Sequence, residues 1–183
     1  MFRKVILVAL AFALSSASAF ADVTERKSLQ VINDITSGVR QYTRFTIFDD
    51  VNVQLEPGGV AVLSGKVTMP FKKDDIGRIV GRVAGVASVK NDLTVLPVSP
   101  FDDDLRYRIA RAIYGNASFW QYAAMANPPI HIVVDRGHVT LTGVVQSNVE
   151  RMMARSLATT FGAFSVKNEL KTDAEMKDIL EKL

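Results

Sequence analysis

The stretch Gly59-Val60-Ala61-Val62-Leu63-Ser64-Gly65-Lys66-Val67 decides the fold, because the chain contains a second version of it. That second version is Gly137-His138-Val139-Thr140-Leu141-Thr142-Gly143-Val144-Val145. A further matching stretch follows each one, at Gly85–Leu93 and at Gly162–Leu170. Ten of the 18 aligned positions are identical, where average residue usage gives roughly one by chance. The chain therefore consists of two copies of one unit.

Each copy carries the same order of signals, which is helix, strand, strand, helix and strand. In the first copy, apolar residues recur at helical spacing from Thr24 to about Tyr42. Apolar and polar residues then alternate on both sides of the turn Pro57-Gly58-Gly59, which is typical of a hairpin with one buried face. The expected elements are a helix over 24–42, strands over 51–55 and 61–67, a helix over 71–84 and a strand over 89–95.

The second copy follows the linker Pro97-Val98-Ser99-Pro100, in which two prolines interrupt regular structure. Its expected elements are a helix from Asp102, strands over 130–135 and 138–145, a helix over 147–161 and a strand over 165–170. The two units are placed at 24–97 and 101–173, and residues 174–183 are predicted to form a short helical tail.

The first 21 residues have the three parts of a secretory signal peptide. Arg3 and Lys4 precede an apolar run over 5–14, and small residues lead up to Ala21. The apolar run is about half as long as a bilayer span requires. We expect cleavage after Ala21, with Ala19 as the alternative, and a soluble exported protein. Because the chain has no cysteine, we expect neither a lipoprotein nor a disulfide framework.

Composition and charge argue against a nucleic-acid partner. The chain is 48% hydrophobic and 22% charged, as in ordinary globular proteins and unlike disordered ones. Its 22 basic and 19 acidic residues give a net charge of +3. Loss of residues 1–21 removes two basic residues and no acidic ones, which leaves a net charge of +1. A charge this small gives no strong field for nucleic acid.

The repeated pattern resembles the BON domain (bacterial OsmY and nodulation domain). The residues that carry the resemblance are G-x-V-x-L-x-G-x-V followed by a helix and by G-V-x-x-V-x-N-x-L, and they cover nearly all of the mature chain. The sequence departs from the pattern at Ala61, where valine is usual, and at Ala163-Phe164 in the Gly-Val position. The resemblance implies an α+β fold of two tandem αββαβ units, each a three-stranded mixed sheet packed against two helices. It also implies a protein without catalytic residues. Exported two-unit members are envelope-stress proteins, and some members bind anionic phospholipid.

Four glycines at matching positions are interpreted as structural. Gly65 and Gly143 lie inside the second strand of each hairpin, and Gly85 and Gly162 follow the second helix. A glycine inside a strand weakens it unless another group must approach closely. We therefore expect a helix to cross the sheet at Gly65, and we expect Gly85 to end its helix.

The sequence offers little for catalysis or for metal binding. A two-residue turn between the strands that carry the two histidines would place His138 opposite Asp135 and His131 opposite Thr142, so the histidines would not converge. No serine lies in a nucleophile-elbow pattern, and no glycine cluster has the spacing of a phosphate loop. We expect a non-catalytic protein with no metal, cofactor or small-molecule substrate.

Most arginines on the predicted helices are expected to be solvated. Arg106 and Arg108 lie about 160° apart on a helical wheel, and their i, i+4 neighbours Asp102 and Asp104 would neutralise them. The acidic run Asp102–Asp104 also suits a helix start. Another pair, Arg151 and Arg155, shares one face of the second unit's second helix.

An aromatic insertion over 115–129 has no counterpart in the first unit. It carries Phe119, Trp120 and Tyr122, and aromatic side chains of this kind suit the boundary between water and a bilayer. The insertion could instead pack on its own sheet or on the first unit, or it could contact a protein partner. The candidate lipid-binding residues are Phe119, Trp120, Tyr122, Arg151 and Arg155.

Two hypotheses for function remain open at this point, both for a periplasmic, non-catalytic protein of the envelope. In the first, the protein contacts membrane surfaces through anionic phospholipid headgroups. In the second, it binds or protects polypeptides, such as envelope proteins, in a chaperone-like or structural role. The sequence does not separate them, because the mature net charge is near zero and no polybasic run exists.

Export predicts a shortened protein. Mass spectrometry of the protein purified from a periplasmic extract should find an N-terminus at Asp22, because the small residues at 19 and 21 suit signal peptidase. Recovery of the chain with Met1 intact would contradict export.

Overall fold

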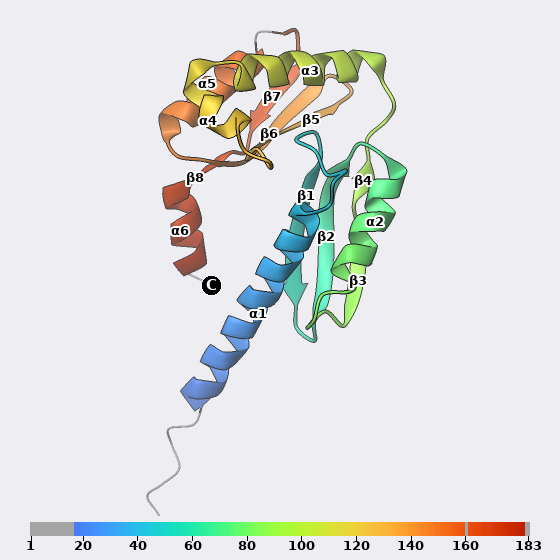
Figure 1. Ribbon diagram of the computed structural model, residues 1–183, viewed down its shortest axis with the longest axis vertical. Coiled ribbons are helices and arrows are strands. Elements are labelled where there is room, and N and C mark those ends of the chain that lie inside the picture. The colour runs from blue at the N-terminus through green and yellow to red at the C-terminus, as the bar shows by residue number, and fades with distance from the viewer. Residues whose placement is uncertain (1–16, 160, 182–183) are drawn as a thin grey trace, which may run out of the picture.

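The computed structural model describes residues 17–159 and 161–181, and Figure 1 shows their course. Residues 1–16 of the expected signal peptide lie outside the described residues. The helix α1, Ala17–Arg40, begins within the remainder and contains the expected cleavage position at Ala21. None of the described helices combines the length and apolar character that a bilayer span requires.

The first unit has the predicted order of elements. They are α1 Ala17–Arg40, β1 Asp50–Glu56, β2 Val60–Val67, α2 Pro70–Val80, β3 Ser88–Asn91 and β4 Thr94–Val95. β1 pairs antiparallel with β2, and β3 and β4 pair parallel with β2 on its other side. β3 and β4 are two pieces of the single strand predicted over 89–95. Between them the N–H of Asp92 donates to the carbonyl of Leu63 at 2.8 Å.

The second unit repeats this topology. Its elements are α3 Pro100–Tyr114, the 3-10 helix η1 Ala117–Phe119, α4 Trp120–Ala123, β5 Ile130–Asp135, β6 His138–Val145, α5 Asn148–Thr159, β7 Ser165–Asn168, β8 Lys171–Thr172 and the tail helix α6 Asp173–Glu181. β5 pairs antiparallel with β6, and β7 and β8 pair parallel with β6. The predicted α+β class with two tandem αββαβ units and mixed sheets is confirmed.

Each sheet buries one face under two helices (Figure 1). In the first unit Ile35 and Val39 of α1 pack with Leu63 and Val67 of β2 and with Ile76 of α2. In the second unit α3 and α5 cover the side of the sheet that is turned away from the first unit. Each unit therefore has a core of its own. Full burial of one such aliphatic side chain stabilises the fold by about 1.5–3 kcal/mol.

The second helix of the first unit is shorter than predicted. α2 ends at Val80 instead of near residue 84, and Gly81 is its C-cap. Residues 81–86 continue in successive turns, in which Val83 N–H donates to the Val80 carbonyl at 3.1 Å and Val86 N–H donates to the Val83 carbonyl at 3.1 Å. Gly85, expected to end the helix, instead lies in these turns, where a Cβ would meet the Val31 side chain at 2.6 Å.

The acidic run at the start of α3 has a larger role than capping. Ser99 is the N-cap and accepts a hydrogen bond from the N–H of Asp102. The carboxylate of Asp102 is fully buried and accepts from the N–H groups of Arg136 and Gly137, at 2.8 Å each. It therefore holds the β5–β6 turn against the helix.

The expected pairing of Asp102 with a solvated Arg106 is wrong. Arg106 is buried, forms its ion pair with Asp103, and donates to the carbonyl of Val134 at 2.6 Å. The predicted pair between Asp104 and Arg108 does form, at 2.7 Å on the exposed side of α3. Arg106 turns inward because an arginine beside a strand can satisfy a buried carbonyl with its guanidinium.

Gly65 and Gly143 have φ angles of 120° and 113°, which L-residues rarely adopt. A Cβ at Gly65 would lie 2.2 Å from the carbonyl oxygen of Asp50, and a Cβ at Gly143 would lie 1.8 Å from that of Pro129. The expectation that a helix crosses the sheet at Gly65 is wrong, because the close neighbour is the backbone at the start of the adjacent strand. Two strand backbones approach each other here at a distance that only glycine permits.

Replacing Gly143 with alanine is expected to lower the free energy of unfolding by more than about 2 kcal/mol. The strained φ contributes about 1–2 kcal/mol and overpacking against Pro129 about 1–3 kcal/mol. Gly162→Ala is the matched control, since Gly162 also has a positive φ of 78° but a Cβ added there would meet nothing within 4 Å. Urea unfolding of both variants measures the difference. An equal cost for the two would show that contact with Pro129 is unimportant.

Candidate functional site

The aromatic insertion divides into buried and exposed residues. Phe119 is fully buried and Tyr122 is 3% exposed in the core of the second unit. The Tyr122 hydroxyl donates to the Glu150 carboxylate at 2.8 Å, and burial together with this bond raises the pKa of Tyr122 to about 12. Trp120 points the other way and is 69% exposed. The assignment of Phe119 and Tyr122 to lipid binding is therefore wrong, because neither reaches the surface.

The two arginines of α5 also differ, because one is paired within the protein and the other is exposed. Nη1 of Arg151 donates to both oxygens of the Glu175 carboxylate, at 2.9 and 3.0 Å, and this pair links the first turn of α6 to α5. Glu175 additionally accepts from the N–H of Thr172, while the Thr172 hydroxyl accepts from the N–H of Glu175. Arg151 is thus a structural residue at the base of the tail helix. Arg155 is exposed and makes no ion pair within the described chain.

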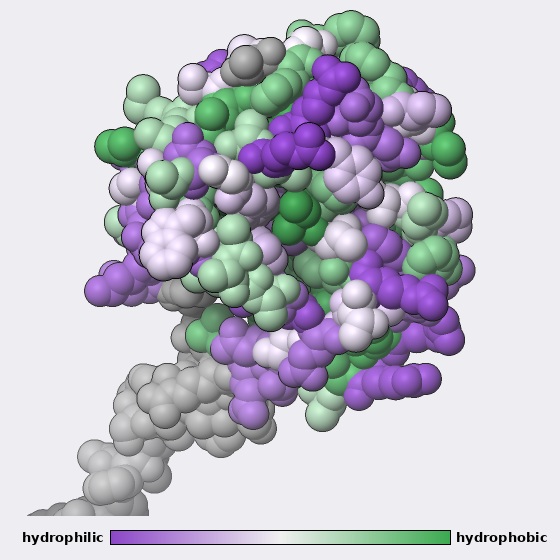
Figure 2. Space-filling model, turned by 45° about the horizontal axis from the view of Figure 1, so that its top comes forward, coloured by the Kyte–Doolittle hydropathy of each residue, from purple (hydrophilic) through white to green (hydrophobic). Residues whose placement is uncertain are grey.

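The outer face of α5 presents large apolar side chains to solvent. Val149 is 69% and Met152 72% exposed, and Arg155 and Thr159 continue the same face at spacings of three and four residues. A shallow hollow runs between Met152, Arg155 and Thr159. We call Val149, Met152 and Arg155 the α5 stripe. The 45° view of Figure 2 brings the helices of this unit forward and shows apolar side chains distributed among hydrophilic ones.

Trp120 is a further exposed apolar side chain of the second unit. It lies on α4, and the hydrogen bond from Tyr122 to Glu150 fastens α4 to the first turn of α5. One exposed indole and two exposed aliphatic side chains thus come from neighbouring helices. Sequence reasoning missed Val149 and Met152, although the small, buried Ala154 and Ala158 mark the opposite face of α5 as its core side.

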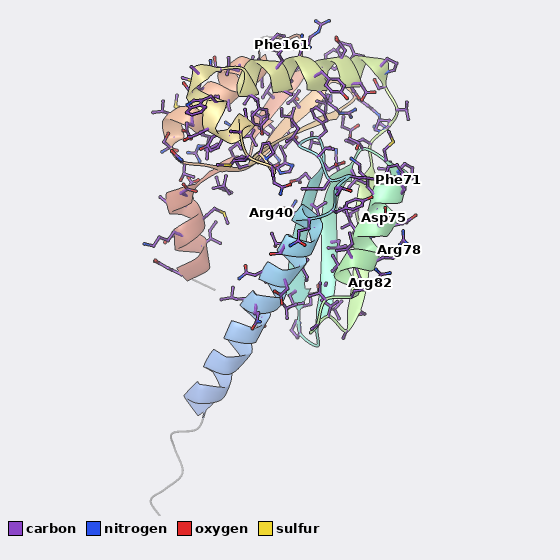
Figure 3. The ribbon with its side chains drawn as sticks, in the orientation of Figure 1. Arg40, Phe71, Asp75, Arg78, Arg82 and Phe161 are labelled. Carbon is purple, nitrogen blue, oxygen red and sulfur yellow. The ribbon has the colours of Figure 1, made fainter. Side chains whose placement is uncertain are left out.

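The first unit has charged side chains, one of them buried, at the corresponding positions. Lys72, Asp75 and Arg78 of α2 align with Val149, Met152 and Arg155. Lys72 is buried in an ion pair, and Asp75 accepts hydrogen bonds from Arg78 and from the Tyr42 hydroxyl. Figure 3 labels Asp75 and Arg78 along the outer side of α2. The two copies therefore share a fold and differ in this face.

The histidines lie where the strand register was predicted to put them. His138 is opposite Asp135 and His131 is opposite Thr142. His138 Nδ1 lies 2.8 Å from the Ser165 hydroxyl on the surface, and His131 Nδ1 lies 2.6 Å from the carbonyl oxygen of Asp49. Among residues 17–159 and 161–181, no three His, Cys, Asp or Glu side chains are grouped as a metal site.

Residues 41–49, which we call the junction segment, connect α1 to β1 and contact both units. Phe45 packs on the first core and its ring centroid lies 5.3 Å from that of His131. Ile47 and Phe48 pack on the second core, and the Ile47 carbonyl accepts from the N–H of Ile132 in β5 at 2.7 Å. The Phe48 ring meets Tyr107 of α3 edge to face. A segment of the first unit thus completes the second.

A buried carboxylate anchors the junction segment. Asp49 has no exposed surface and accepts hydrogen bonds from Lys72 at 2.6 Å and from the N–H and hydroxyl groups of Thr46 and Thr68 at 2.8–2.9 Å. Burial by itself would raise the pKa of Asp49, but the hydrogen bonds from Lys72, Thr68 and Thr46 outweigh it and hold the pKa below its ordinary value.

Two further polar contacts join the units beside this anchor. Lys66 of β2 pairs with Asp135 of β5 at 2.6 Å, and the Thr142 hydroxyl donates to the Asp50 carboxylate at 2.8 Å. The lysine and aspartate remain 41% and 28% exposed, so solvent weakens this pair.

A cleft lies between the units, next to the junction segment. One part, of about 630 Å³, is lined by α1, β1, the ends of β6 and β7, and α6. A second part, of about 420 Å³, extends along Phe45–Ile47 to the insertion at 125–129. Arg40 and His131 border both parts, and Figure 3 shows Arg40 at the end of α1 below the second unit.

A family model described as the BON domain matches residues 30–97 and 102–174. BON domains are non-catalytic binding domains associated with envelope and osmotic-stress proteins and with phospholipid binding. The comparison with curated proteins finds no match.

Two solved structures of CdsD, a structural protein of the type III secretion system of Chlamydia trachomatis, are similar to this chain. The match to its C-terminal domain has 15% identity and a TM-score of 0.28, and it covers 66% of this chain and 55% of that one. The other has 17% identity and a TM-score of 0.31, and it covers 83% of this chain and 97% of that one.

Replacing Lys72 with methionine is expected to destabilise the protein by about 3–5 kcal/mol, because it leaves the Asp49 carboxylate buried without its cation. Lys66→Met, at the half-exposed pair between the units, should cost about 1 kcal/mol or less. Urea unfolding followed by circular dichroism measures both. Similar costs for the two variants would mean that Asp49 is not the anchor of the junction segment.

The lowered pKa of Asp49 sets the pH dependence of the same anchor. Its stabilising contribution is fully present above the unfolded-state pKa of about 3.9 and is lost as the pH falls through the lower folded-state pKa. The stability difference between the native protein and Asp49→Asn should therefore shrink below about pH 4. A difference that stays constant down to pH 2 would contradict the assignment.

Proposed function

The chain belongs to the BON domain family, and on that premise we propose that it is an exported, non-catalytic envelope protein that contacts anionic phospholipid surfaces through its second unit. The expected signal peptide supports a periplasmic location. The observation that carries the proposal is the α5 stripe, in which exposed apolar side chains lie beside an arginine that forms no ion pair among the described residues.

The chemistry of this surface suits a membrane interface. Val149 and Met152 can enter the boundary between headgroups and acyl chains, where burial of each is worth up to about 1.5–3 kcal/mol. Trp120 has an apolar ring and a polar N–H, the combination that favours the interface. Arg155 adds about 1 kcal/mol near an anionic surface. The sum is enough for reversible attachment and far below that of a membrane span.

The first unit supports this assignment by contrast. Its equivalent face carries Lys72, Asp75 and Arg78 in ion pairs, so its charges are already satisfied within the protein. Binding to lipid should therefore depend mainly on the second unit.

Flotation with liposomes of anionic and zwitterionic lipid over a salt series tests the proposal. Trp120→Ala and Met152→Ser should weaken binding to anionic liposomes at every salt concentration, because they remove apolar contact. Arg155→Glu should weaken it by at least about fivefold at low salt, because it removes one attractive charge and adds a repulsive one, and by less at about 1 M salt, where charges are screened beyond about 3 Å. Arg82→Glu, an exposed arginine just after α2 (Figure 3), is the matched control and should have little effect.

Fluorescence of Trp120, the only tryptophan, provides an independent measurement. Its emission in buffer should be that of an exposed indole and should shift to the blue with anionic liposomes only. Equal binding by the native protein and Trp120→Ala, or no emission shift, would sink the lipid proposal.

A further inference from the structure

The cleft between the units contains an open strand edge. β1 lies at the edge of its sheet, and within the described chain its strand partner is β2 alone. The last residue of the junction segment that forms a backbone hydrogen bond to another part of the chain is Asp49. The backbone pairing described for residues 51–55 is with β2 alone. An antiparallel edge strand directs every second N–H and C=O outward. Unlike most exposed edges, this one borders a cleft, which Asp50–Val53 line.

The walls of the cleft beside this strand edge are partly apolar. Val51 and Val53 provide apolar surface on the side of the first unit, and Val144 and Met176 provide it on the side of the second. A chain laid along β1 would alternate its side chains between these apolar groups and the rim. An acyl chain could fill the apolar part but has no donors or acceptors for the strand edge, so an extended polypeptide fits better.

The charges at the rim favour an acidic segment. Arg40 and Lys171 border the cleft and form no ion pair among the described residues. Of the two acidic lining residues, Glu169 is paired with Lys167, whereas Asp50 accepts from the neutral groups of Thr142 and Asn52 and keeps its charge. Within the described chain, the lining thus has two unpaired cations, Arg40 and Lys171, against one uncompensated carboxylate, and the balance is positive.

We propose that this cleft binds an extended, acidic polypeptide segment that adds to β1 as a further strand. The site is separate from the α5 stripe, since α5 covers the side of the second sheet turned away from the first unit (Figure 1). The protein would then contact lipid on one side and an envelope polypeptide on the other, and each site can fail without the other.

Fluorescence anisotropy with a labelled decapeptide of alternating valine and glutamate tests the proposal on the mature chain. Saturable binding is expected. Methylation of those alternate backbone nitrogens of the peptide whose N–H groups face β1 should weaken binding about tenfold, because it removes hydrogen bonds between the strands. Either of the two alternate sets of nitrogens can face β1, so both are methylated in separate peptides, and one of the two should lose binding. A peptide with lysine in place of glutamate should bind several-fold more weakly.

Variants and NMR locate the binding. Arg40→Glu should weaken binding of the valine–glutamate peptide several-fold, whereas Arg111→Glu, an exposed arginine on α3, should leave it unchanged. Amide shifts in a 15N-labelled sample should concentrate at 50–55 and 142–144. No saturable binding, equal binding of both methylated peptides and the parent, or shifts confined to other elements would overturn the proposal, as would displacement of the peptide by anionic liposomes.

Discussion

The carboxylate of Asp49 is fully buried, and the hydrogen bonds that it accepts from Thr46, Thr68 and Lys72 hold residues 41–49 in one arrangement. A buried carboxylate without such partners would cost several kcal/mol, so the segment cannot swing away without leaving that charge unsatisfied. The same segment presents the Ile47 carbonyl and the Phe48 ring to the second unit. The position of the second sheet, and with it the shape of the cleft, therefore depends on a carboxylate that belongs to the first unit.

The strands were predictable because their alternation is local. β5 and β6 have the predicted bounds, since apolar and polar residues largely alternate on either side of a two-residue turn, with Val133 and Val144 as the exceptions. The end of α2 was not predictable from spacing, because Val83 continues the apolar pattern while the backbone already turns at Gly81. The reason for Gly65 was equally hidden: a glycine in a strand indicates close approach, but not whether a helix or a neighbouring strand approaches.

The candidate surface was predictable only in part. Trp120 reaches solvent while Phe119 and Tyr122 do not, and composition cannot separate them because the same aromatic side chains suit cores and interfaces. Arg151 and Arg155 share a helix face, yet only the fold brings Glu175 to one of them. Val149 and Met152 read as ordinary apolar residues until the helix is placed on its sheet. The cleft, whose lining comes from both units, has no local signature at all.

The junction segment also bears on how such a tandem protein can be divided. The linker at 97–99 looks like the natural boundary, and Val98 is 93% exposed. Yet Ile47 and Phe48, some fifty residues earlier, cover part of the second core. The second half of the chain is therefore not a module that recombination could transplant at the linker: moved alone, it would arrive with an uncovered patch. The duplicated halves have become interdependent, and exchange between relatives would have to move the junction segment with the second unit or preserve both halves together.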